Sequence, residues 1–372
     1  IPYTASGFAA CGKLFSSLFG VKYLTAMIIS AIVIVAYTTL GGFLAASTTD
    51  FIQSIIMSVA LIVVLIFGVE TAGGIGAVIH NASELPGYLS MTLSYDVNTG
   101  KAAPYSALTI VSTAAWGLGY FGMPHILLRF MAIEDEKKLK LSRRVATIWV
   151  VISLFVAVFI GVIGYTMSKV GALEMLTGSN SETIIVKISA LLSQYGVIFA
   201  LLAGVILAGI LASTMSTSDS QLLAASSAVS SDILGAFRKD SSNKNGSMAA
   251  ARITLLVISV VAAFIARNPD SSVFAIVSFA WAGFGAAFGP VVLFSLFWKR
   301  TSKWGALAGM VCGGSMVFIW KYLIRPLGGI WNIYELLPAF LIACAAIVIV
   351  SLLTPKPSKE IEEEFDRVAQ MK

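Results

Sequence analysis

The stretch FALLAGVILAGILASTMSTSDSQLLAAS, residues 199–226, decides the fold class of this chain. It is long and apolar enough to cross a bilayer as one helix, because a span needs about 20 predominantly apolar residues. Polar side chains interrupt it in a single run: Ser213, Thr214, Ser216, Thr217, Ser218, Asp219 and Ser220. The sequence therefore predicts polar chemistry inside a membrane span.

A carboxylate among hydroxyls is an oxygen-rich environment that suits a small hard cation. Ser and Thr alone would be weak evidence, since their hydroxyls also bond back to helix carbonyls or join neighbouring helices. Asp219 makes ion binding the better interpretation, because an ionised carboxylate inside a membrane is costly unless a partner compensates its charge. The alternative places Asp219 at the cytoplasmic interface, solvated and inert.

The composition of the whole chain is that of an integral membrane protein. Hydrophobic residues make up 58% of the 372 residues, charged residues only 12%, and the mean hydropathy is +0.89. Soluble domains carry about twice that charged fraction. We predict an all-α, multi-span helical bundle of about ten spans, the first partial, near residues 1–20, 22–45, 48–69, 106–128, 146–168, 190–222, 252–267, 273–298, 304–324 and 334–353.

The chain begins at Ile1, already within a multi-span pattern and without a signal peptide. We therefore expect a fragment that lacks further N-terminal helices.

The distribution of Lys and Arg predicts the orientation in the membrane. Basic residues gather in the loops at 129–144 and 225–252 and again at 299–303, whereas the connections at 169–183 and 268–272 have almost none. Because cytoplasmic loops carry the excess of positive charge, these three basic segments are predicted to be cytoplasmic. The predicted organisation is one transmembrane domain, 1–353, and a cytoplasmic C-terminal tail, 354–372. The net charge of +6 then needs no nucleic-acid partner.

The motif GLGYFG at 117–122 has the spacing of a dinucleotide-binding loop, but no strand precedes it and it lies within a span. Its glycines and Pro124 instead predict a broken helix, which in membranes is tolerated where it lines a cavity and often marks a solute site. Trp116 and Tyr120 are spaced i, i+4 and are predicted to share a face with Pro124, as a wall for an apolar ring. A packing kink with interfacial aromatics is the equal alternative.

Asp50 follows Ser47, Thr48 and Thr49 at the predicted cytoplasmic start of a span. It is either an N-cap for the next helix or part of an ion pathway. No nucleophile, base or metal cluster converges in the sequence, so we do not expect an enzyme. The three cysteines, at 11, 312 and 344, are interpreted as packing residues.

Four blocks carry a resemblance to a known family: YTTLGGFLAASTTDFIQ (37–53), WGLGYFGMPHILLRFMA (116–132), ILASTMSTSDSQLLAASSAVSSD (210–232) and SFAWAGFGAAFGPVVLFSLFWKR (278–300). In order and spacing the chain resembles the sodium/solute symporter family, and within it the sodium/proline symporters. The resemblance implies a five-plus-five inverted-repeat transporter core, with its N-terminal part missing here, plus extra C-terminal helices.

The resemblance also implies roles for particular residues in sodium binding. Ser216 and Thr217 resemble hydroxyl ligands of the coupling sodium, with the backbone carbonyl of Ser213 as a third ligand. Asp50 matches a carboxylate implicated in sodium handling. With Asp219 and Ser220 it is similar to a second cation site, or an ion exit path, of some members.

For the solute, Trp116, Tyr120 and Pro124 resemble the face that contacts proline, and Tyr3 resembles an aromatic that closes over it. The expected activity is sodium-coupled import of L-proline by alternating access across the cell inner (plasma) membrane. The partners implied are the solute, Na⁺ as coupling ion and the lipid bilayer. The alternatives are a sodium symporter of pantothenate, a sugar or another amino acid, and a membrane sensor input domain of the same fold.

Overall fold

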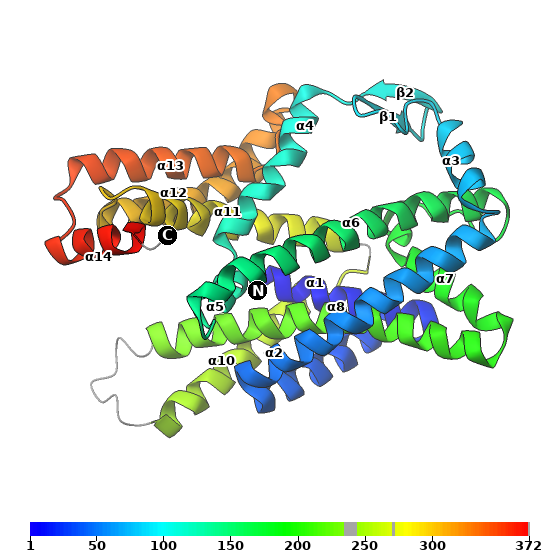
Figure 1. Cartoon of the computed structure of the whole chain (residues 1–372), viewed down its shortest axis with the longest axis horizontal. Helices are drawn as coiled ribbons and strands as arrows, with labels where there is room; N and C mark the ends of the chain where they lie inside the picture. Colours follow the sequence, from blue (N-terminus) through cyan, green and yellow to red (C-terminus); the bar gives the residue numbers. More distant parts are fainter. Residues whose placement is uncertain (234–243, 270–271, 371–372) are drawn as a thin grey trace. The chain divides into compact units, whose positions relative to one another are not determined.

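The computed structural model describes residues 1–233, 244–269 and 272–370. These residues fold almost entirely into helices, with one two-stranded sheet (Figure 1). Arg238 and Lys239 of the predicted inner loop lie outside the described residues. The helices and strands are α1 (Pro2–Phe19), α2 (Tyr23–Thr71), α3 (Ile75–Ser83), β1 (Leu93–Asp96), β2 (Lys101–Pro104), α4 (Ala107–Ala114), η1 (Ala115–Gly122), α5 (Pro124–Met131), η2 (Glu136–Lys138), α6 (Leu139–Lys169), η3 (Gly178–Thr183), α7 (Ile184–Leu192), η4 (Ser193–Tyr195), α8 (Val197–Ser227), η5 (Ala228–Ile233), α10 (Lys244–Ile265), α11 (Val273–Phe297), α12 (Lys303–Ile319), η6 (Trp320–Ile324), η7 (Arg325–Leu327), η8 (Gly329–Trp331), α13 (Leu336–Leu353) and α14 (Lys359–Gln370).

Eight helical segments of the described chain are long and apolar enough to cross a membrane. They are Tyr23–Gly42, Ala46–Thr71, Glu136–Lys169, Val197–Ser230, Met248–Ile265, Val273–Phe297, Lys303–Leu327 and Leu336–Leu353. The predicted spans at 1–20 and 106–128 are not among the eight. The all-α membrane class is confirmed.

The break predicted at the GLGYFG motif is present. The predicted span 106–128 consists of α4, the 3₁₀ helix η1 and α5, and Met123 between the last two is extended (φ −81°, ψ 109°). The physical reason is Pro124, which disfavours a helical conformation at the residue before it but suits the first turn of a new helix.

Two further glycines set helix boundaries. Gly42 interrupts α2 with φ 64° and ψ −166°, and so separates the two predicted spans at 22–45 and 48–69. Gly196 has φ 118° and lies between η4 and α8. The prediction that one helix covers 190–222 was therefore wrong at its start, because glycine readily adopts a positive φ that ends a helix.

The chain divides into two compact units, each described here by itself. Unit 1 comprises residues 1–90, 94–103 and 134–277, and unit 2 comprises residues 91–93, 104–133 and 278–372.

In unit 1, small residues let the helices around α8 approach closely. A Cβ at Gly7 of α1 would lie 1.9 Å from Ser218 Oγ, and one at Gly209 would lie 2.8 Å from the Ala60 Cβ of α2. Helix α8 therefore packs against α1 on one side and α2 on another, as small-residue contacts allow in membranes.

Small residues also allow close helix packing in unit 2. A Cβ at Gly285 of α11 would lie 2.7 Å from Gly119 Cα, and one at Gly313 of α12 would lie 2.2 Å from the Ala286 carbonyl oxygen. The broken segment η1 therefore lies directly against α11.

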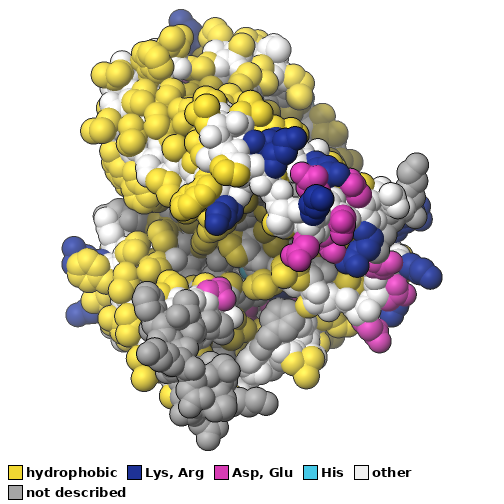
Figure 2. All heavy atoms as spheres, turned by 90° about the vertical axis from the view of Figure 1, so that its left-hand side faces the viewer, with side chains coloured by type: hydrophobic (Ala, Val, Ile, Leu, Met, Phe, Trp, Pro, Cys, Tyr) yellow, Lys and Arg dark blue, Asp and Glu magenta, His cyan; other side chains and the backbone are white. Residues whose placement is uncertain are grey.

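Large apolar side chains remain exposed along the outer faces of the helices, Leu40, Leu44 and Val158 among them. Figure 2 shows hydrophobic side chains over much of the face in view. Such apolar outer faces suit helices that face lipid, because lipid tails, unlike water, do not drive apolar side chains into the protein interior.

Candidate ion-binding and solute-binding sites

The three oxygens predicted to hold the coupling sodium form one cluster on α8. Ser216 Oγ lies 3.2 Å and Thr217 Oγ1 3.1 Å from the carbonyl oxygen of Ser213, to which both hydroxyls donate. The helix itself produces this cluster, since residues three and four apart share a face. Each hydroxyl oxygen keeps lone pairs that can face a cation.

The two predicted ion-path carboxylates also meet within unit 1, one turn further along α8. Ser220 Oγ lies 3.3 Å from Asp219 Oδ1 and 3.5 Å from Asp50 Oδ2 of α2. A serine hydroxyl has a single proton, so it can donate to only one of the two carboxylates at a time. Ser220 thus bridges an Asp pair contributed by two helices.

Tyr37 of α2 completes this group and was missed in the sequence. Its hydroxyl lies 2.9 Å from Asp219 Oδ2 and 3.3 Å from the Met215 carbonyl oxygen. The only sequence signal was that Tyr37 opens the block 37–53 that also contains Asp50.

Asp219 is fully buried, with 0% of its surface exposed. The side chains that donate to it, Tyr37 and Ser220, are neutral hydroxyls. Among the described residues these donors carry no positive charge, so the ionised carboxylate is stabilised by a bound cation and otherwise by a proton, because desolvation of the charge costs several kcal/mol. The solvated-interface alternative for Asp219 therefore does not fit its position in this structure.

The predicted solute residues Trp116, Tyr120 and Pro124 lie in unit 2, and two of them contact Trp281 of α11. The rings of Trp116 and Trp281 are stacked, 5.3 Å apart, and Tyr120 meets Trp281 edge-on at 4.8 Å. Trp281 Nε1 donates to the Trp116 carbonyl oxygen at 2.9 Å, and Tyr334 stacks on Trp116 at 6.1 Å.

The prediction that these three residues share one α-helical face was wrong. Trp116 and Tyr120 belong to a 3₁₀ helix, and Pro124 starts α5 beyond the extended Met123. A 3₁₀ helix has three residues per turn, so residues four apart no longer align. Contact with Trp281, and not helical periodicity, brings Trp116 and Tyr120 together. Tyr120 remains 44% exposed.

Tyr3 lies in α1 of unit 1, half-buried, and its carbonyl oxygen accepts a hydrogen bond from Ser6 Oγ at 2.6 Å. It therefore belongs to the same unit as the oxygen cluster and the Asp pair.

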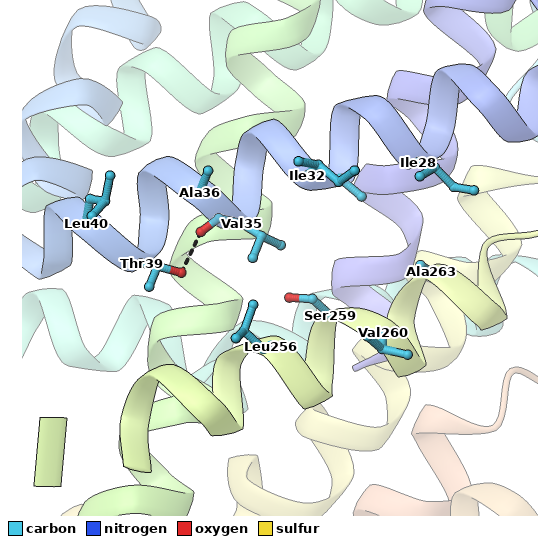
Figure 3. Close-up of a pocket in the computed structure, with 11 residues that line it drawn as sticks. Ile28, Ile32, Val35, Ala36, Thr39, Leu40, Leu256, Ser259, Val260 and Ala263 are labelled. Carbon is cyan, nitrogen blue, oxygen red and sulfur yellow. Dashed lines mark hydrogen bonds between the residues drawn. The ribbon is translucent and has the colours of Figure 1, made fainter. Parts of the chain in front are cut away.

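Between α2 and α10 lies a groove of about 600 Å³ (Figure 3). Its walls are almost entirely apolar, with Ile32, Val35 and Leu256 among the side chains that face it. The few hydroxyls include that of Thr39, which donates to the Val35 carbonyl oxygen at 2.6 Å. A strongly polar solute would find few polar partners here, so we assign no solute site to this groove.

A charged contact joins three segments of unit 1 around Glu182 of η3. Lys13 Nζ of α1 donates to Glu182 Oε2 at 2.7 Å, and Ser272 Oγ donates to Glu182 Oε1 at 2.8 Å. The backbone amides of Val273 and Phe274, at the start of α11, also point to this carboxylate. Partial burial acts to raise the pKa of Glu182, but these hydrogen bonds outweigh it and hold the pKa below its usual value.

Comparisons with known proteins show which family the chain resembles. The family described as "Sodium:solute symporter family" matches residues 1–313. The osmoregulated proline transporter OpuE of Bacillus subtilis is 38% identical over 357 residues, which cover 96% of this chain and 69% of OpuE. A sodium/proline symporter of Haemophilus influenzae is 40% identical over 371 residues, 98% of this chain and 71% of its own.

A solved structure of a Na⁺-coupled sialic acid symporter, in a substrate-bound outward-open state, matches with a TM-score of 0.73. The match covers 96% of this chain and 73% of that one at 16% sequence identity, so it shows the shared fold. The chain is a multi-pass protein of the plasma membrane with sodium as its coupling ion. It belongs to the sodium:solute symporter family.

Proposed function

We propose that this protein imports L-proline together with sodium by alternating access. The observation that carries the proposal is the oxygen cluster of Ser213, Ser216 and Thr217 on α8, in a chain whose relatives at 36–40% identity are named proline transporters or sodium/proline symporters. Three neutral oxygens within one helical turn suit a weakly held monovalent cation, which must also be released.

The proposed solute face is the aromatic group of Trp116 and Tyr120 in unit 2, with Pro124 as a further contact. Tyr3, in unit 1, stays a prediction from the family resemblance. Tyr120 supports the proposal most directly, because its ring packs edge-on against Trp281 while a large part of it stays exposed. An apolar pyrrolidine ring gains free energy by burial against such a surface. The helix is interrupted at the extended Met123, between η1 and α5, and breaks of this kind line the solute sites of transporters.

We assign the Asp50, Asp219 and Ser220 group to the ion path, as a second cation site or as the exit for the first ion. Its support is the burial of Asp219 and the position of the Asp pair one turn from the oxygen cluster. A departing cation needs replacement oxygens as its first ligands release it.

Coupling follows from differential affinity. A bound ligand shifts a conformational equilibrium only as far as it binds the two states unequally. Sodium and proline must therefore each favour the same conformations for one to drive the other.

We infer that residues 1–353 form one transmembrane domain and that the tail, 354–372, is cytoplasmic. In unit 2, Lys299 Nζ after α11 pairs with Asp366 of α14 at 2.5 Å, which puts the tail beside one of the basic loops. Basic loops are cytoplasmic by the positive-inside rule. Transport without an enzymatic reaction is the activity we assign.

Uptake of labelled proline into proteoliposomes tests the proposal. We expect uptake that requires an inward sodium gradient and is inhibited by unlabelled proline, with potassium unable to replace sodium. Inhibition by pantothenate, a sugar or another amino acid in place of proline would identify a different solute. Binding without any transport would favour the sensor alternative.

A further inference from the structure

Five residues of α2 lie on one stripe with helical spacing, and two of them, Asp50 and Ala60, contact α8. Asp50, Gln53, Met57, Ala60 and Val64 are separated by steps of three and four residues, so they lie on one face of α2. At one end Asp50 meets Ser220 of α8, and further along Ala60 meets Gly209. Ala60 and Val64 are 6% and 1% exposed, so this face is buried against its neighbour.

These contacts fix the register of the two helices. As residue numbers rise along α2 from 50 to 60, those of α8 fall from 220 to 209, so the helices are antiparallel. Gln53 lies three residues from Asp50, about 4.5 Å along the axis. It is therefore level with the turn of α8 that carries Ser216 and Thr217.

The Gln53 amide oxygen, Oε1, is buried and accepts no hydrogen bond from any residue that the structure describes. A buried amide carbonyl without a donor costs free energy, on the order of 1–3 kcal/mol, so such an atom calls for an explanation. An amide oxygen is also a good ligand for a hard cation.

We propose that the Gln53 side chain is a further sodium ligand, on the path between the Ser213–Thr217 oxygen cluster and the Asp50–Asp219 pair. The inference rests on the proposed sodium coupling and adds a residue to it. Gln53 contributes a neutral oxygen from α2 opposite the hydroxyls of α8, so that an ion leaving the cluster meets an acceptor before it reaches the carboxylates. Its unsatisfied carbonyl is stabilised whenever sodium is present there.

The test compares Gln53→Leu, which removes the oxygen at similar volume, with Gln53→Glu, which keeps an oxygen at the same reach. The matched control is Ser54→Ala on the next position of α2, where the hydroxyl donates within its own helix to the Phe51 carbonyl oxygen at 2.7 Å. Each variant of the complete protein is measured for sodium-dependent proline uptake and for the rise in melting temperature that sodium alone produces at constant ionic strength.

In Gln53→Leu we expect the half-activating sodium concentration to rise roughly tenfold, in line with one lost charge–dipole contact. The sodium-induced rise in melting temperature should shrink, while proline affinity at saturating sodium stays within about twofold. Gln53→Glu keeps an oxygen ligand and should lose less sodium activation than Gln53→Leu, and Ser54→Ala should stay close to the wild type. If Gln53→Leu does not fold, Gln53→Met takes its place in the same measurements.

Wild-type sodium activation and an unchanged melting shift in Gln53→Leu would overturn the inference and leave sodium coupling intact. A lower melting temperature without sodium, with unchanged half-activation, would also overturn it, because it assigns Gln53 to packing alone. If the wild-type protein showed no sodium dependence, the proposed function itself would fail.

Discussion

The Tyr37 hydroxyl donates to Asp219 Oδ2 at 2.9 Å, across 182 positions of sequence. The bond joins the first half of α2 to the polar run of α8. The Tyr37 hydroxyl is one of the neutral donors to the buried Asp219 carboxylate. It therefore competes with a cation for Asp219 Oδ2.

Replacing Tyr37 with Phe removes that donor at nearly constant volume. We expect the half-activating sodium concentration to change by about tenfold or more, since a hydrogen bond to a charged group is worth about 1.5–3 kcal/mol. Tyr23→Phe is the control, because the Tyr23 hydroxyl donates instead to the Ala266 carbonyl oxygen at 2.6 Å. Equal sodium dependence in the two variants would show that Tyr37 has no influence on the ion.

Ser216→Ala and Thr217→Ala each remove one oxygen of the α8 cluster. We expect either change to raise the sodium requirement of uptake by about five- to a hundred-fold, equivalent to roughly 1–3 kcal/mol. Ser218→Ala is the matched control, because its hydroxyl makes the same kind of bond, to Thr214 at 2.9 Å, but faces Gly7 of α1. A sodium requirement unchanged in both test variants would remove these residues from the site.

Asp219→Asn keeps the size of the side chain and removes its charge. If Asp219 holds a second cation, the ratio of charge moved to proline taken up should fall, whereas Asp50→Asn should mainly raise the sodium requirement. The measurement is current and proline flux on the same proteoliposomes. An unaltered ratio with wild-type sodium dependence would leave a single sodium site.

Tyr120→Ala should weaken proline binding by roughly 1–2 kcal/mol, about five- to thirty-fold, through lost apolar contact. Sodium binding without proline should change little. Phe121→Ala is the control, because Phe121 is a neighbouring aromatic with a similar exposed fraction, 42%. Equal loss in both variants would identify η1 as a packing kink and not a solute surface.

Glu182 gives a prediction about pH. Its pKa is lowered in the folded protein, so its contribution to stability is present above the unfolded pKa and is lost as pH falls through the folded value. We expect Glu182→Gln to lower the free energy of unfolding at neutral pH by on the order of 1 kcal/mol. The difference in melting temperature between wild type and variant should close as pH falls below about 4, the ordinary Glu pKa. A difference that stays constant with pH would exclude the carboxylate charge as its cause.

Local sequence was enough to predict the membrane class, the break at Pro124 and a polar run on α8 that suits a cation. Hydropathy and the conformational limits of Gly and Pro act over a single turn or a single span, so they can be seen without a fold. The choice of Ser213, Ser216 and Thr217 within that run came from the resemblance to the family, and helical geometry brings these residues together because they are three and four apart. The 3₁₀ conformation of η1 was not predicted, since it depends on the close approach of α11 at Gly119.

Only the tertiary structure placed Tyr37 at Asp219 and Trp281 against Trp116, and it gave the contact between Asp50 and Ser220 its geometry. The Asp50–Ser220 contact joins residues 170 positions apart, and the Trp116–Trp281 hydrogen bond joins residues 165 positions apart. Periodicity identifies the buried face of each helix but not the helix that covers it. Close packing at small residues such as Gly7 and Gly209 determines where the helices of unit 1 meet. It therefore also determines which polar groups lie in the same site.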